Sequence, residues 1–220
     1  EVSAMNKVKV AIVGLGSFGE LHLDVLSSLA GVEITGLVEQ KPQRRQYLAD
    51  KYQVPDHYES LNALLTEHSV DAVFIATEDT AHLEPTLTAL RGGAHVFLEK
   101  PISPDLVEAR AMIDEAASLQ RKFMIGHVCR FEARSAIIKQ RIVSKDLGRV
   151  LTVYGRRNMS KAFQDQYSHS NRLFTTGVHD IDLILWLYEG LRPVEVYLKT
   201  INAQGKGDDV FWGIITMENG

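Results

Sequence analysis

The sequence has few of the features that mark secreted, membrane or nucleic-acid-binding proteins. Cys129 is its single cysteine, so no disulfide can form within the chain, and we expect a reducing, cytoplasmic compartment. Its apolar runs fall far short of a membrane span, and the N-terminus lacks the apolar core of a signal peptide. A net charge of −4 at pH 7 argues against nucleic acid as the main partner, despite small basic clusters at 41–45 and 156–157.

Metal-ligand patterns are also missing. His127, His169 and His179 lack the tight spacing typical of zinc ligands, so we expect no metal site. Cys129 has no clear partner for nucleophilic chemistry, and a small buried residue is its simplest interpretation.

What the sequence does contain is 45% hydrophobic residues in a chain of 220, arranged in short apolar segments that alternate with helical patterns. In the first part of the chain we expect strands at 8–13, 33–38, 72–76, 95–98 and 122–125. Helices are expected directly after residue 19 and at about 42–51, 60–65, 80–91 and 104–120. This alternation predicts an α/β fold with a doubly wound parallel sheet, whose ligand site lies beyond the carboxyl ends of the strands.

The pattern changes after Gly126. We expect a helix at 132–143, a strand at 150–155, a polar stretch without a clear period at 158–171, and a helix at 178–188. Two strands at 194–201 and 210–217 are separated by glycines and aspartates and are expected to pair as a hairpin. The chain is therefore expected to form two domains, 5–126 and 127–220, the second an α+β domain with a largely antiparallel sheet.

Gly14, Gly16 and Gly19 follow the first expected strand and precede an apolar-periodic helix. Gly14 permits the turn, Gly16 lets a pyrophosphate approach the backbone, and Gly19 lets the helix lie close to the strand. The phosphates would bind the free N–H groups at the helix N-terminus. Glu39 ends the second expected strand 20 residues after Gly19, where a carboxylate can accept hydrogen bonds from an adenosine ribose. These parts predict a dinucleotide-binding Rossmann domain, and the alternative is an ordinary βαβ unit with a chance acid.

Two short motifs contain candidate catalytic residues. Lys100, in Glu99-Lys100-Pro101 after the strand at 95–98, could hold a substrate hydroxyl and relay a proton, but spacing alone favours a solvated acid–base pair. His179 and Asp182 are three residues apart on one face of the helix at 178–188, so Asp182 could orient the imidazole. A histidine near a helix end, with acids as N-terminal charges, explains His179 equally well.

Two residues near these motifs are weaker candidates. His82 follows a loop at 77–80 beside the expected cofactor site, where it could contact the cofactor or simply support the loop. Arg130 lies near the domain junction, where it could bind a substrate oxygen, although a structural salt bridge is the more common role.

Several motifs have the order and spacing of a known family: Gly14–Gly19 with His22, Glu39, Ala76-Thr77 with His82, Gly93–Pro101, Arg130-Phe131, Leu147–Val150 and Gly177–Asp182. In these residues the chain resembles the Gfo/Idh/MocA family of NAD(P)-dependent oxidoreductases, which includes glucose-fructose oxidoreductase and inositol dehydrogenase. The resemblance runs from Lys7 to Gly220, and its Glu-Lys-Pro motif is more specific than its glycine motif.

The resemblance implies hydride transfer between a nicotinamide and a carbon of a sugar, cyclitol or similar polyol. Lys100 would bind the reacting hydroxyl, and His179 would take its proton. The implied cofactor-binding residues are Gly14, Gly16, Ser17, Phe18, Gly19, Glu39, Thr77, His82, Glu99 and Lys100. The implied substrate-binding residues are Arg130, Thr175 and Asp182. Family members usually oligomerise through the second-domain sheet, which implies a dimer or tetramer here.

The sequence departs from the family pattern in two ways. Thr175 stands where members commonly have an aspartate, four residues before the histidine, and a threonine cannot act as a carboxylate base. The family's second domain usually has more strands and helices than the sequence from 127 to 220 provides, so we expect a truncated chain.

The leading interpretation is a dehydrogenase that uses NAD, because Glu39 would repel the 2′-phosphate of NADP. Lys41, Arg44 and Arg45 leave NADP possible, since a nearby cation can receive that phosphate. Thr175 motivates a second interpretation, a redox-inactive protein that senses a dinucleotide or a sugar. A third is a glycoside hydrolase in which transient oxidation by NAD assists cleavage.

Overall fold

The computed structural model describes residues 6–160, 171–202 and 210–220. The chain divides into two compact units, Glu1–Gly126 and His127–Gly220.

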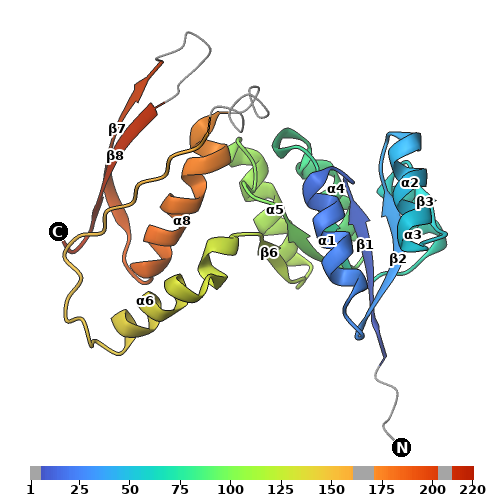
Figure 1. Cartoon of the computed structure of the whole chain (residues 1–220), viewed down its shortest axis with the longest axis horizontal. Coiled ribbons are helices and arrows are strands. Elements are labelled where there is room, and N and C mark those ends of the chain that lie inside the picture. The colour runs from blue at the N-terminus through green and yellow to red at the C-terminus, as the bar shows by residue number, and fades with distance from the viewer. Residues whose placement is uncertain (1–5, 161–170, 203–209) are drawn as a thin grey trace, which may run out of the picture. The chain divides into compact units, whose positions relative to one another are not determined.

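The first unit is built on a six-stranded parallel sheet with the strand order β3-β2-β1-β4-β5-β6 (Figure 1). The strands are β1 Val8–Val13, β2 Val32–Val38, β3 His57–Tyr58, β4 Ala72–Ile75, β5 His95–Leu98 and β6 Phe123–Ile125. The order reverses at β1, from which the chain moves first toward β3 and then, through β4, toward β6. The predicted doubly wound sheet is confirmed, and its five longer strands lie where the apolar runs predicted them.

Helices cover both faces of this sheet: α1 Ser17–Ser27, α2 Pro42–Tyr52, α3 Leu61–Glu67, α4 Leu83–Arg91 and α5 Leu106–Ser118. Successive residues of β1 point to opposite faces, so Val10 and Ile12 pack with α1 and α2. Ala11 and Val13 pack with α3, α4 and α5 on the other face. Because both faces are covered, the strands had to be apolar throughout.

Two predicted helix starts are wrong by a few residues. The helix predicted from residue 104 begins at Leu106, because the Asp105 carboxylate accepts the N–H groups of Val107 and Glu108. The helix predicted from residue 80 is divided into a 3₁₀ turn, η1 Asp79–Ala81, and α4.

The second unit contains the 3₁₀ turn η2 Val128–Phe131, the helices α6 Ala133–Val143 and α8 Val178–Leu187, and the π-helical turn η3 Leu173–Gly177. Two strands, β7 Pro193–Ile201 and β8 Val210–Met217, form an antiparallel ribbon (Figure 1). This confirms the predicted hairpin. Its expected turn, and most of the polar stretch at 158–171, lie outside the described residues.

Two predictions for the second unit are wrong. Residues 150–155 form no strand, because in the described part of the chain β7 and β8 pair only with each other and supply no partner. The expected apolar stripe of the helix at 178–188 included Leu185, which is 36% exposed, whereas Asp182 is 8% exposed. A buried carboxylate needs a charged partner, and Arg130 provides one here.

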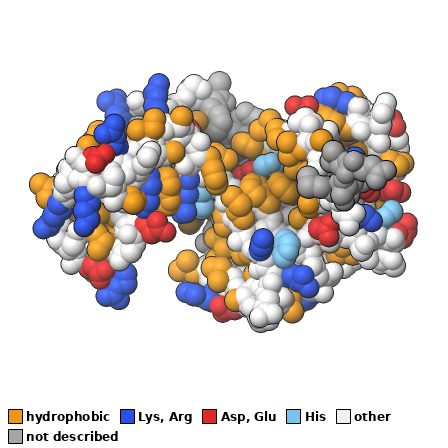
Figure 2. All heavy atoms as spheres, turned by 90° about the horizontal axis from the view of Figure 1, so that it is seen from below, with side chains coloured by type: hydrophobic (Ala, Val, Ile, Leu, Met, Phe, Trp, Pro, Cys, Tyr) orange, Lys and Arg blue, Asp and Glu red, His pale blue; other side chains and the backbone are white. Residues whose placement is uncertain are grey.

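Within the described ranges, no helix is long and apolar enough to cross a bilayer. Charged side chains of both signs are interspersed with hydrophobic ones on the face shown in Figure 2.

Candidate cofactor and catalytic site

Gly14 and Gly19 are required by the fold itself. Gly14 has a φ of +83°, and a Cβ there would lie 2.8 Å from backbone atoms of Ala76 and Thr77. A Cβ on Gly19 would lie 1.9 Å from the carbonyl oxygen of Gly14. The turn after β1 therefore brings the start of α1 against its own strand and against the end of β4, the strand beside it.

Gly16 differs from the other two glycines, because a Cβ on it would meet nothing within 4 Å. It is the N-cap of α1 and has no side chain to bond the N–H groups of the first turn, which Ser17 and Phe18 begin. Open space, a missing Cβ and the positive end of a helix dipole together fit an anionic pyrophosphate.

Glu39 reaches the glycine turn from the end of β2. Its Oε2 accepts a hydrogen bond from the Leu15 N–H at 2.9 Å, and its Oε1 accepts one from the Lys41 N–H at 3.0 Å. The carboxylate is thereby held beside the turn, where its remaining lone pairs can accept ribose hydroxyls.

His82 joins two loops at this edge of the sheet. The side chain is 1% exposed, and its Nδ1 lies 2.9 Å from the Pro101 carbonyl oxygen. Its Nε2 lies 3.3 Å from the carbonyl oxygen of Thr77, whose own hydroxyl donates to Ala81. These contacts connect the loop after β4 with the loop after β5 and so help to fix the segment that follows Lys100.

Glu99 forms a buried pair with His22 of α1. The His22 Nε2 lies 2.8 Å from Glu99 Oε1, and Glu99 is 7% exposed. Its other oxygen accepts the Lys100 N–H at 3.2 Å. Burial acts to raise the pKa of the Glu99 carboxyl, but the hydrogen bond from His22, the Lys100 N–H and the nearby charges together outweigh it and lower that pKa.

The His22 ring is itself enclosed by aromatic side chains. Its centroid lies 5.1 Å from that of Phe97, which stacks on Phe74 at 4.8 Å. From the sequence, His22 was recognised only as part of the family pattern, and its pair with Glu99 was not predicted because the two partners are 77 residues apart.

Lys100 lies among apolar and acidic neighbours. Its ammonium is 5.8 Å from the ring centroid of Phe18 in the first turn of α1. Burial lowers the pKa of Lys100, while the charges of Glu99 and Asp79 act against that change. A lysine of this kind can hold a hydroxyl oxygen and also exchange a proton near neutral pH more readily than an exposed lysine.

In the second unit, Arg130 and Asp182 form a bidentate pair. Arg130 Nε donates to Asp182 Oδ2 at 2.8 Å, and Arg130 Nη2 donates to Asp182 Oδ1. His127 Nε2 lies 3.5 Å from the same Oδ1. From the sequence, Asp182 was expected to orient His179. In the structure, the Asp182 carboxylate contacts Arg130 and His127.

A second pair at the start of α8 was missed by the sequence analysis. Arg157 binds both carboxylate oxygens of Asp180, at 2.9 Å and 3.0 Å, and its Nη2 lies 3.8 Å from the Cys129 thiol. The hydrogen bonds from Arg157 hold Asp180 in the first turn of α8, next to His179.

His179 and Thr175 occupy neighbouring turns of one continuous helical segment. His179 is half-buried in the first turn of α8. Thr175 lies in the preceding π-helical turn, and its hydroxyl donates to the Asn171 carbonyl at 3.3 Å. The structure thus brings the predicted cofactor residues together in the first unit, and Arg130, Thr175, His179 and Asp182 lie on or beside α8 in the second.

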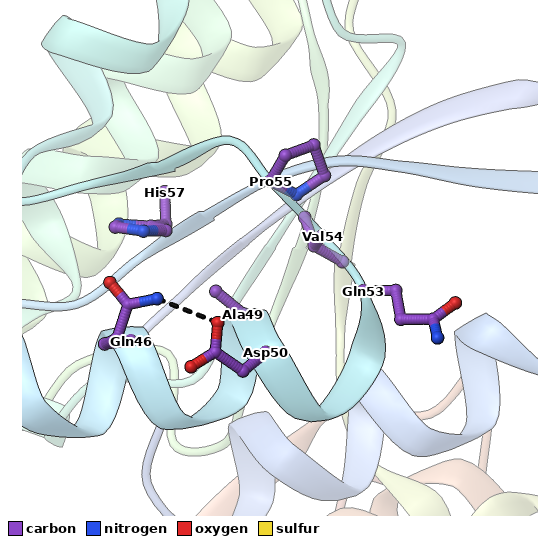
Figure 3. Close-up of a pocket in the computed structure, with 7 residues that line it drawn as sticks. All are labelled: Gln46, Ala49, Asp50, Gln53, Val54, Pro55 and His57. Atoms are coloured by element: carbon purple, nitrogen blue, oxygen red, sulfur yellow. Dashed lines mark hydrogen bonds between the residues drawn. The ribbon is translucent and has the colours of Figure 1, made fainter.

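A separate hollow lies between α2 and β3 (Figure 3). It is lined by Gln46, Ala49, Asp50, Gln53, Val54, Pro55 and His57. Gln46 and Asp50 lie across its floor and hydrogen-bond to each other at 2.8 Å. None of the predicted site residues lines it.

Comparison with known proteins gives two family matches that together cover most of the chain. The family model described as "Oxidoreductase family, NAD-binding Rossmann fold", of the Gfo/Idh/MocA type, matches residues 8–127. The model of the Gfo/Idh/MocA C-terminal domain matches residues 136–220.

Curated relatives and solved structures agree with these matches. The 4-carboxy-2-hydroxymuconate-6-semialdehyde dehydrogenase of Sphingobium sp. is 29% identical over 81% of this chain and 58% of its own length. Inositol 2-dehydrogenase of Salmonella paratyphi B is 29% identical over 86% of this chain and 57% of its own length. The structure of apo scyllo-inositol dehydrogenase from Lactobacillus casei has the same fold, with a TM-score of 0.90 at 22% identity over 98% of this chain and 66% of its own. The chain thus spans a little over half the length of these curated relatives.

Proposed function

This chain belongs to the Gfo/Idh/MocA oxidoreductase family and carries its NAD-binding Rossmann domain, and on that premise we propose that it acts as an NAD-dependent oxidoreductase on a CH–OH group. The observation that carries the proposal is the open space beside Gly16 at the N-terminus of α1, with the Glu39 carboxylate at the same turn. When bound there, the nicotinamide cofactor supplies the hydride acceptor or donor.

Residues of the first unit would hold the dinucleotide. The N–H groups after Gly16, from Ser17 onward, bind the pyrophosphate, and Glu39 accepts the ribose hydroxyls. His82 holds the loop after Thr77, so that this loop keeps its place at the carboxyl edge of the sheet.

Lys100 binds the oxygen of the reacting hydroxyl through its ammonium group. The bond polarises the hydroxyl and favours the loss of its proton. Glu99 supports this role, since it accepts the Lys100 N–H and is itself held by His22. The lowered pKa of Lys100 makes the proton that it shares with the substrate easier to move.

His179 takes the proton of the reacting hydroxyl in the direction of oxidation and returns it in the reverse direction. Asp180 and Asp182, on the same helical turn, are paired with Arg157 and Arg130 and offset the charges of these arginines near the imidazole. Arg130 offers its remaining N–H donors to other substrate oxygens, and the Thr175 hydroxyl, which donates to the Asn171 carbonyl, can accept a hydrogen bond from a substrate hydroxyl. Thr175 cannot hold a negative charge, so proton acceptance falls to His179 and Lys100.

A cyclitol, a sugar or a related polyol is the substrate class that we propose. The curated name of the Salmonella relative is inositol 2-dehydrogenase, and the Lactobacillus casei structure is that of a scyllo-inositol dehydrogenase. The Sphingobium relative is named for a carboxylated semialdehyde. A screen should therefore include both neutral polyols and hydroxy acids.

The first experiment is calorimetric titration of the protein with NADH and with NADPH. NADH is expected to bind the wild type and to fail with Gly16→Val, because the new side chain fills the space reserved for the pyrophosphate. Gly31→Val is the matched control, since a Cβ on Gly31 also meets nothing within 4 Å and Gly31 lies in the turn before β2. Loss of binding in both variants, or in neither, would contradict the proposed site.

Turnover is tested next, by following the reduction of NAD with a panel of polyols and hydroxy acids. Lys100→Met serves as the inactive reference, and its NADH affinity is measured beside its turnover. A wild-type protein that binds NADH tightly but oxidises no member of the panel would favour the redox-inactive sensor that Thr175 suggests.

A further inference from the structure

A second set of charged residues lies beside Glu39 at the adenosine end of the proposed cofactor site, and the proposed function leaves it unused. Glu20 extends from α1, and Arg44 and Lys51 extend from the facing helix α2. Arg44 Nη2 donates to Glu20 Oε2 at 2.5 Å, and Lys51 Nζ donates to Glu20 Oε1 at 2.7 Å. One carboxylate therefore binds both cations.

Arg44 is fixed at a second point. Its Nε donates to the carbonyl oxygen of Leu15 at 2.7 Å, while the Leu15 N–H donates to Glu39. The guanidinium is thus bonded through Nε to the glycine turn and through Nη2 to Glu20. These two contacts engage two of its five N–H donors, and the Glu20 carboxylate offsets its charge.

Arg45, the neighbouring cation, is also engaged. Its Nη1 donates to the backbone oxygen of Glu39 at 2.5 Å. Two of the three basic residues that could receive the 2′-phosphate of NADP are therefore occupied by contacts within the protein.

We propose that Glu20 is a specificity-determining residue, which favours NAD over NADP by pairing with the Arg44 guanidinium and so competing with a 2′-phosphate for that cation. This inference rests on the proposed cofactor site, and it adds a second contribution to the repulsion by Glu39. Glu39 excludes the phosphate by its charge, whereas Glu20 withholds the cation that would otherwise bind it.

Lys41 is the competing candidate for phosphate binding. It lies two residues after Glu39, and among the described residues its ammonium group makes no hydrogen bond or ion pair. A test must therefore separate the effect of Arg44 from that of Lys41.

The test is a series of variants in a Glu39→Ser background, which removes the direct repulsion. Dissociation constants for NADH and NADPH are measured by titration, with no substrate needed. Adding Glu20→Gln should raise NADPH affinity by about tenfold, as expected for one freed charge-assisted contact, and should change NADH affinity much less. Adding Arg44→Gln to that pair should abolish the gain, whereas adding Lys41→Gln should preserve most of it.

Three results would overturn the inference while leaving the cofactor site intact. In the first, NADH binds but Glu20→Gln does not raise the affinity for NADPH. In the second, the raised NADPH affinity persists when Arg44→Gln is added. In the third, only Lys41→Gln removes the raised NADPH affinity. Failure of the wild type to bind either dinucleotide, from folded protein, would instead overturn the proposed function itself and this inference with it. Thermal unfolding of each variant confirms that the near-isosteric changes leave the fold intact.

Discussion

At the scale of single residues, the three glycines of the turn after β1 serve different ends. Gly14 and Gly19 are demanded by the backbone, because any Cβ there would overlap neighbouring main-chain atoms. Gly16 is not demanded by anything in the protein, since its Cβ position is open. The glycine motif therefore combines two residues that the fold needs with one that leaves open space for the proposed pyrophosphate.

This division predicts opposite effects on stability and on binding. Gly19→Ala should lower the free energy of unfolding by about 3 kcal/mol or more, because α1 must move away from β1 to admit the methyl group. Gly16→Ala should change it by no more than about 1 kcal/mol. Urea unfolding of both variants provides the comparison, and equal losses of stability would contradict the assignment.

Lys100 offers a second prediction at this scale. Burial lowers its pKa from the ordinary 10.5, whereas the hydrogen bond to Glu20 raises that of Lys51. As the pH rises, Lys100 should therefore lose its proton before Lys51 and become reactive toward acetic anhydride at a lower pH. Trace labelling at a series of pH values, followed by peptide mass spectrometry, gives both profiles.

The Glu99→Gln variant sharpens the Lys100 experiment. Removing the Glu99 charge takes away a contribution that holds the Lys100 pKa up, so the labelling profile should move to still lower pH. A Lys100 profile at or above that of Lys51 would show that burial does not control this lysine.

At the scale of helices and strands, much of the first unit is predictable from its sequence. Strands buried on both faces consist of apolar residues throughout, and breaks at glycine, proline and charged residues mark where they end. The two-residue strand β3 was not predicted, because His57 and Tyr58 are too few to show a period. Helix starts depended on the caps. Before α5 the sequence offers two start signals, Pro104 and Asp105, and the helix begins after Asp105.

Long-range pairs could not be predicted in the same way. Pairs such as His22–Glu99 and Arg130–Asp182 join residues 77 and 52 positions apart, and no local pattern connects them. The strand expected at 150–155 failed for the same reason, since a β-branched sequence suits a sheet but does not supply a neighbour. The candidate residues of the site were predictable by motif, and their supporting partners were not.

The pair between α1 and the end of β5 predicts a dependence of stability on pH. Because the folded pKa of Glu99 lies below its ordinary 4.5, Glu99 stabilises the fold above that pH, and the contribution is lost as the pH falls through the folded value. His22→Ala leaves the carboxylate buried without its partner, so at pH 7 it should cost about 2 kcal/mol.

Guanidinium unfolding between pH 7 and pH 3 checks this prediction. The difference between the wild type and His22→Ala should shrink as Glu99 becomes protonated at acid pH. His22→Ala combined with Glu99→Gln should recover part of the loss at pH 7, since no buried charge remains. A difference that stays constant with pH would mean that only packing against Phe74 and Phe97 was lost.

At the scale of the whole molecule, the β7–β8 ribbon predicts self-association. On one of its faces Tyr197 lies opposite Ile214, and Lys199 lies opposite Trp212. Of the three apolar side chains, Tyr197 is 60% exposed, Ile214 is 66% exposed and Trp212 is 62% exposed. An unpaired apolar face of this kind is typical of an interface. We therefore expect a dimer or a tetramer that forms through this face.

Trp212→Glu should weaken this association by about tenfold or more, because it places a charge at the centre of the face. Val196→Glu is the control, since Val196 is 64% exposed, lies opposite Ile215 and is on the other face of the ribbon by strand alternation. Sedimentation velocity over a range of concentrations measures both. An unchanged distribution for Trp212→Glu would assign the contact to another surface.

The placement of the tryptophans has a consequence for spectroscopy. The chain has two, Trp186 in α8 and Trp212 in β8, so both lie in the second unit. The Lys139 ammonium lies 5.4 Å from the ring centroid of Trp186, whereas Trp212 is exposed. The emission of the two tryptophans should therefore respond differently to quenchers in the solvent. Tryptophan fluorescence therefore monitors the second unit alone, while the fluorescence of a bound reduced dinucleotide monitors the first. Energy transfer from the tryptophans to a bound reduced dinucleotide would therefore depend on the distance between the two units, which are joined at Gly126.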